Sequence, residues 1–307
     1  MLTADAELAV VRHDGGDLTR ARRLAEDALT LSASIIDRGE DHDGVAANVA
    51  VKVSAYLASW AVDDGDWPAA LRAGDRTLTA ASAFAARFPD RVAGRFAVAF
   101  AWQRVGTARE RAGDLTGATE ANHRSLDLLN ELLAGEPANV TYQLARGRAL
   151  ENLGRVALGR HDRAEARRRL DASAAQLAAL IAASPDDPDL ARRVASIEVS
   201  RADLDRALGG AAAAHDGYLR AIDAYERALE LAPALHVVRG ELGAALTRLA
   251  ELEQGRNDAP AARRALERGL GLSREALGAA PTALARRALA EQLMLQAELD
   301  PAAAPAA

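Results

Sequence analysis

The chain has 307 residues, a formal charge of −6 at neutral pH, 50% apolar but only 4% aromatic residues, and no cysteine. The lack of cysteine excludes a disulfide framework and a Cys-ligated zinc site, and the mild acidity argues against bulk affinity for nucleic acid. Apolar residues that are largely alanine favour closely packed helices over sheets, so we expect an all-α fold.

The N-terminal segment, residues 4–13, is expected to be the tail of a first helix. It contains Asp5 and Glu7 and lacks the basic start and apolar stretch of a signal peptide. No apolar stretch is expected to reach the length of a membrane span. We therefore expect a cytoplasmic protein with no membrane partner.

A repeat organises the rest of the chain. Five of the ten prolines recur at an interval of 48 residues: Pro89, Pro137, Pro185, Pro233 and Pro281. Proline lacks the N–H that continues a helix and disfavours helical backbone in the residue before it. We therefore expect helices to end at Phe88-Pro89, Glu136-Pro137, Ser184-Pro185 and Ala232-Pro233.

Two columns of small residues share this interval. One is Ala70, Ala118, Ala166, Ala214 and Ala262, and the other is Ala58, Gly106, Gly154, Ala202 and Ala250. A unit of this length holds two antiparallel helices of roughly 18 to 20 residues, and small residues let their axes cross closely. We expect units ending near residues 41, 89, 137, 185, 233 and 281.

The turn inside each unit has its own chemistry. In Gly16-Asp17, Gly65-Asp66 and Gly113-Asp114 the glycine is expected to end one helix in left-handed backbone, and the aspartate to cap the next. His161-Asp162 and Asn257-Asp258 are weaker versions of this turn. The segment 208–217, with Gly209, Gly210 and Gly217, is predicted to hold a longer or shifted turn.

After the last unit, residues 282–299 are expected to form a capping helix and residues 300–307 a disordered tail. The predicted domain is therefore a single solenoid over residues 1–299, with five to six hairpins and the cap.

The repeat resembles the tetratricopeptide repeat (TPR). The family pattern of a large aromatic, a residue followed by Gly, then Gly-Asp and later Ala and Pro is met by Trp102, Val105-Gly106, Gly113-Asp114-Leu115, Ala118 and Pro137. Residues 217–233 also follow the end of a standard repeat, and the resemblance covers residues 4–299. The departure is length, because the usual unit has about 34 residues.

The resemblance implies a right-handed α-solenoid of antiparallel helical hairpins, whose first helices line a concave groove. A protein-interaction scaffold or sensor module that binds a peptide or helix is the function that follows. The longer unit also resembles C-terminal repeat regions of bacterial signalling NTPases and serine/threonine kinases. The alternative is therefore the regulatory part of such a protein, with its catalytic part outside this chain.

Projecting the repeat onto the first helices gives the groove candidates. These are Lys52, Tyr56, Phe100, Gln103, Arg104, Arg148, Asn152, Arg155 and Arg248. Arginine pairs well with carboxylates, and asparagine can hold a peptide backbone, so an acidic protein or peptide partner is favoured. The bland alternative is that these are ordinary solvated positions on helices. Ala-rich helix faces also allow a homodimer.

Catalytic and cofactor motifs do not stand out. No phosphate-binding glycine loop, dinucleotide fingerprint, nucleophile elbow or zinc-protease helix is present, so no enzyme activity, cofactor or metal is expected. The acidic loop at residues 37–43 is interpreted as a capped turn rather than a metal site. The arginines at residues 160–169 alternate with carboxylates, which favours a solvated helix over a nucleic-acid contact.

Overall fold

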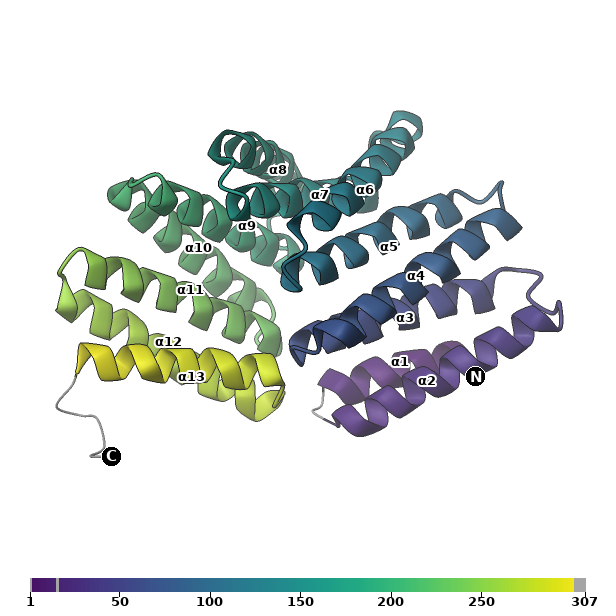
Figure 1. The fold of residues 1–307 in the computed structure, drawn as a ribbon, viewed down its shortest axis with the longest axis horizontal. Coiled ribbons are helices and arrows are strands. Elements are labelled where there is room, and N and C mark those ends of the chain that lie inside the picture. The colour runs from purple at the N-terminus through teal and green to yellow at the C-terminus, as the bar shows by residue number, and fades with distance from the viewer. Residues whose placement is uncertain (1, 15–16, 301–307) are drawn as a thin grey trace. The chain divides into compact units, whose positions relative to one another are not determined.

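The structure, a computed structural model, describes residues 2–14 and 17–300. Over these residues the chain forms thirteen α-helices (Figure 1). Their bounds are α1 Leu2–Asp14, α2 Leu18–Asp37, α3 Val45–Asp63, α4 Trp67–Arg87, α5 Val92–Arg111, α6 Leu115–Gly135, α7 Val140–Gly159, α8 Arg163–Ala183, α9 Pro188–Ala207, α10 Ala211–Leu231, α11 His236–Gly255, α12 Ala259–Ala279 and α13 Ala283–Leu299. The predicted all-α architecture of TPR-like helical hairpins is confirmed.

The chain divides into two compact units. The first ends at His161 and contains α1 to α7, and the second begins at Asp162 and contains α8 to α13. Within each unit, successive helices pack against one another, and an odd-numbered first helix forms a hairpin with the even-numbered second helix after it.

The repeat sets the ends of the helices. Helices α4, α6, α8, α10 and α12 each end two residues before one of the five repeated prolines. The residues that precede these prolines leave the helical region; Phe88, for example, has φ −127° and ψ 65°. The predicted helix exits are confirmed, because each proline follows the residue that closes the last turn.

The turns inside the hairpins repeat at one backbone position. Gly65, Gly113 and Gly209 have φ of 69°, 84° and 80°, and His161 and Asn257 occupy the same column with φ of 61° and 62°. The next residue in four of these turns is an aspartate that caps the second helix, as Asp114 Oδ1 does by accepting from Gly117 N at 2.8 Å.

The turn before α10 differs from its prediction. It is neither longer nor shifted, because Gly209 takes the left-handed position and α10 begins at Ala211, in register with the other second helices. The difference is chemical: Gly210 stands where the other turns have aspartate, so α10 has no side-chain cap.

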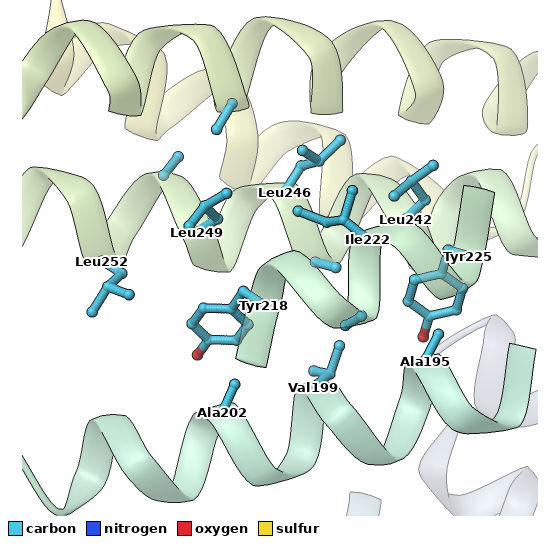
Figure 2. Packing of buried hydrophobic residues seen from close by; sticks show 14 of the residues in the cluster. Ala195, Val199, Ala202, Tyr218, Ile222, Tyr225, Leu242, Leu246, Leu249 and Leu252 are labelled. Atoms are coloured by element: carbon cyan, nitrogen blue, oxygen red, sulfur yellow. The ribbon is translucent and has the colours of Figure 1, made fainter. Parts of the chain in front are cut away.

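The core lies between the helices of successive hairpins. All five alanines of the first small-residue column, from Ala70 to Ala262, have no exposed surface, which confirms close helix crossings. Figure 2 shows this packing in the second unit, where Tyr218 and Ile222 of α10 lie between Val199 of α9 and Leu246 of α11. A first helix such as α11 thus packs between two second helices, α10 and α12.

Helix α3 corrects the expectation that no segment could cross a membrane. Among the described residues it is the one helix that is long and apolar enough by length and composition. More than half of its apolar window is buried, and Val49 and Val53 belong to the core that α3 shares with α1 and α2.

The capping helix α13 begins after Thr282, whose hydroxyl accepts from Ala285 N at 3.1 Å. Its Gln292 is buried and donates to Thr247 Oγ1 at 2.8 Å and to Gly243 O at 3.2 Å. Of the predicted tail, Asp300 closes α13 as its C-cap, and residues 301–307 lie outside the described residues.

Candidate functional site

In each of the two compact units the candidate residues fall on one side of the first helices, and this side is here called the first-helix face of that unit. Two of its columns are Lys52, Phe100 and Arg148, and Tyr56, Arg104, Asn152, Ser200 and Arg248. Members of the two columns lie four residues apart on each helix, so they share a helical face. Helix α5 packs beside α3 and α7 in the first unit, and α9 packs beside α11 in the second.

Two of the predicted residues do not reach the surface. Gln103 is 2% exposed and donates from Nε2 to Ala145 O at 2.7 Å. Asn152 is 3% exposed and donates to Asn122 Oδ1 at 3.1 Å. Their amides are therefore structural bonds between helices, and neither is available to hold a peptide backbone.

Arg104 lies across the first-helix face of the first unit. Its Nη1 donates to Ser59 Oγ of α3 at 3.0 Å, and its guanidinium carbon lies 4.6 Å from the centre of the Phe100 ring. Two predicted residues, Phe100 and Arg104, are thus brought together by a cation–π contact. Arg148, one turn before Asn152 on α7, is half-buried.

Arg155 forms a bidentate ion pair on this face. Its Nε and Nη2 donate to the two carboxylate oxygens of Glu110 at 3.1 and 2.7 Å, and its Nη1 donates to Glu151 at 3.4 Å. Burial disfavours the charged guanidinium, but the two carboxylates outweigh that effect and raise the pKa of Arg155. The bidentate pair ties α7 to α5 and offsets the charge that was predicted to attract an acidic partner.

The second unit has corresponding contacts between α9 and α11. Arg248 Nε lies 3.4 Å from Asp203 Oδ1, and Arg206 Nη1 donates to Glu251 at 2.8 Å. Asp203 also accepts from the Tyr218 hydroxyl at 2.6 Å. Burial of the Tyr218 ring raises the pKa of its hydroxyl, and the neighbouring Asp203 carboxylate raises it further.

These contacts share one spacing that the sequence analysis missed. Ser59 and Arg104, Glu110 and Arg155, Asp203 and Arg248, and Arg206 and Glu251 are each 45 residues apart. The repeat is 48 residues long, so the residue 48 positions earlier is the equivalent one on the preceding first helix. A partner 45 positions earlier lies three residues, or about one turn, beyond that equivalent position. A comparison of the sequence with itself at this offset would have found Ser59, Glu110 and Glu251.

The exposed part of the first-helix face is smaller than predicted. Lys52 is exposed, Tyr56 is 38% exposed, and the Arg248 side chain is 44% exposed. Tyr56 stacks on the buried Trp60 ring, with 6.3 Å between centroids, so the tryptophan holds the tyrosine ring in position. Exposed and anchored side chains of this kind are suited to contact a partner.

The acidic loop before α3 forms capping contacts. Asp41 is buried and accepts from Ala46 N at 2.9 Å and from Ala47 N at 3.1 Å, while Glu40 pairs with Arg38 at 2.9 Å. Over residues 2–14 and 17–300, no group of three or more histidine or carboxylate side chains is arranged to hold a metal ion. What the first-helix face offers chemically is hydrogen bonding, positive charge and aromatic surface.

No family model matches the sequence, and no curated protein matches it. Solved structures of similar fold include TTC0263, a thermophilic TPR protein of Thermus thermophilus, at 20% identity and TM-score 0.45; 75% of this chain and 95% of that one are covered. BtubC from P. vanneervenii is similar at 16% identity and TM-score 0.44, with 77% and 93% covered. The S. pombe nuclear import adaptor Nro1 is similar at 14% identity and TM-score 0.44, with 94% and 97% covered.

These similarities are distant, so the description of the fold rests on the helix bounds, caps and packing of this chain. Nuclear import is a property of Nro1.

Proposed function

We propose that this protein is a non-catalytic interaction scaffold whose two compact units each offer a first-helix face to a peptide or helix of another protein. The observation that carries the proposal is the set of side-chain pairs at a spacing of 45 residues, which fixes polar groups along that face before any partner arrives. Side chains that are already ordered lose little entropy on binding, so their contacts contribute more to affinity.

The proposed contact residues are the exposed ones, Lys52 and Tyr56 in the first unit and Arg248 in the second. Lys52 brings positive charge, which favours an acidic partner, and Tyr56 brings a fixed aromatic surface. Arg248 is exposed, and its charge is partly offset by Asp203. Arg104 and Arg155 are assigned a supporting role, because they bind other first helices. The cytoplasm is the proposed compartment, as the sequence without cysteine predicts.

The test is selection of binding peptides from a displayed random library on the full chain. A double variant, Lys52→Glu with Arg248→Glu, reverses the exposed charge of the first-helix face. Its matched control, Arg23→Glu with Arg264→Glu, makes the same change of charge on exposed positions of the second helices α2 and α12. Circular dichroism first establishes that both variants are folded.

We expect acidic peptides to be enriched by the wild-type chain and by the control variant, and to bind the Lys52/Arg248 variant at least about tenfold more weakly. Enriched peptides that bind both variants equally would move the site away from the first-helix face. Failure to enrich any peptide would argue against a peptide-binding scaffold.

A further inference from the structure

A cavity of about 420 Å³ opens between α8 and α9 in the second unit. Its floor is formed by the buried side chains of Leu177 and Ile197, and its walls by residues such as Ala174, Ile181 and Val194. Asp171, Glu198 and Arg201 line its polar part. None of these residues belongs to the first-helix face.

The repeat explains why the cavity is there. At the position equivalent to Ala174, the neighbouring 48-residue repeats have Leu126 and Ile222, which are buried in their clusters. At the position of Glu198 they have Leu150 and Leu246, and at that of Arg201 they have Leu153 and Leu249, all buried. Figure 2 shows the filled equivalent, in which Ile222 of α10 lies among Leu242, Leu246 and Leu249 of α11.

One replacement increases the side-chain volume, because Ile197 stands where the neighbouring repeats have Ala149 and Ala245. Its larger side chain forms part of the floor but leaves the volume of the missing leucines open. The cavity is open to solvent on one side, and its apolar floor is accessible to an aliphatic group from outside the chain.

The charged groups at the cavity compensate one another. Arg201 donates from Nη1 to Glu198 Oε1 at 2.9 Å and lies 3.2 Å from Asp171 Oδ1 through Nη2. Glu198 also accepts from Arg220 Nε at 2.8 Å. Two carboxylates facing two guanidinium groups leave no excess charge for an ionic ligand, so the apolar surface decides what binds.

We infer that the α8–α9 cavity receives a leucine-sized aliphatic side chain from a partner polypeptide, which occupies the volume that the chain's own leucines fill in neighbouring units. The inference rests on the proposed scaffold function for the kind of partner, and it adds a second surface distinct from the first-helix face.

The test uses the full chain with labelled isoleucine, leucine and valine methyl groups, titrated with N-acetyl-leucine methylamide. We expect NMR shift changes at the methyl groups of Ile181, Val194 and Ile197, and none with the corresponding glycine compound. Ala174→Leu, which restores the side chain of the neighbouring unit, is expected to weaken these changes at least about tenfold and to raise the melting temperature. Ala172→Leu, on the exposed surface of α8 and outside the cavity, should leave the titration unchanged.

A titration that Ala174→Leu leaves unchanged would overturn the inference, as would a lower melting temperature of that variant, because the leucine would then have no room. Equal shifts with hexanoate would assign the cavity to free acyl chains instead of a polypeptide. Loss of peptide binding in the Lys52/Arg248 variant is a separate result, so failure of the cavity and failure of the first-helix face are distinguishable.

Discussion

Replacing Gly106 by alanine tests how closely the helices that support the first-helix face are packed. Gly106 lies on α5 against Asn122 of α6, and an added Cβ would lie 2.5 Å from Asn122 Nδ2 and 2.9 Å from its Cγ. Asn122 has no room to move aside. It is fully buried, donates to Ala118 O at 2.8 Å and accepts from Asn152 at 3.1 Å.

Three effects set the size of the change. Overpacking of a core costs about 1–3 kcal/mol, and loss of one amide hydrogen bond costs about 0.5–1.5 kcal/mol. Alanine in place of glycine inside a helix returns about 0.8–1 kcal/mol. We therefore expect Gly106→Ala to lower the free energy of unfolding of the first unit by roughly 1–3 kcal/mol.

Urea denaturation followed by tryptophan fluorescence measures this effect in the first unit, because Trp60, Trp67 and Trp102 all belong to it. The matched control is Gly135→Ala in the last turn of α6, where an added methyl group has no neighbour within 4 Å. The control should be neutral or up to about 1 kcal/mol more stable. A Gly106 variant as stable as this control would show that α5 and α6 do not approach as closely as described.

Three further predictions concern single features of the fold. Tyr218→Phe should lose about 1–2 kcal/mol at neutral pH with the bond to Asp203. The pKa of Tyr218 is raised in the folded state above its ordinary value of 10.0, so its contribution to stability is present below pH 10 and is lost as the pH rises above that value. In urea denaturation, the free energy of unfolding of the phenylalanine variant should therefore fall less at alkaline pH than that of the wild type. His161→Gly should raise the melting temperature, since left-handed backbone costs about 1–2 kcal/mol for a residue with a Cβ; an unchanged or lower value would contradict this. Deletion of residues 283–307 should lower the melting temperature and increase binding of a hydrophobic dye, because α13 contributes Leu295, Leu299 and Gln292 to the core; an unchanged melt would count against packing by neighbours.

The sequence predicts the helices well because each boundary is encoded locally. Proline, a residue in left-handed backbone and a capping aspartate act within a few residues of the chain, so their columns determine the starts and ends of helices. The prediction for residues 208–217 is wrong because Gly209, Gly210 and Gly217 have separate structural roles. Only Gly209 belongs to the left-handed column, and the other two replace a cap and a packing residue.

The candidate site was harder to predict, because burial on a first helix depends on the crossing of neighbouring helices. Projection of one helix places Gln103 and Arg104 side by side, yet only the packing of α7 buries the Gln103 amide against Ala145 O. Projection also omits partners on other helices, such as Glu110 for Arg155. The spacing of 45 residues becomes meaningful only once the helices are known to lie side by side.

The repeat therefore serves as an internal reference for function. Where the 48-residue repeats share a residue, as in the column from Ala70 to Ala262, the fold itself requires that residue. Where one repeat departs from the others, the departure is caused either by local contacts or by function. Ala174, Glu198 and Arg201 depart together, on two helices that face each other, and they stand where the neighbouring repeats have leucine or isoleucine in the core. Three linked departures are better explained by a binding requirement than by chance, which makes the α8–α9 cavity the most informative place in the chain to probe.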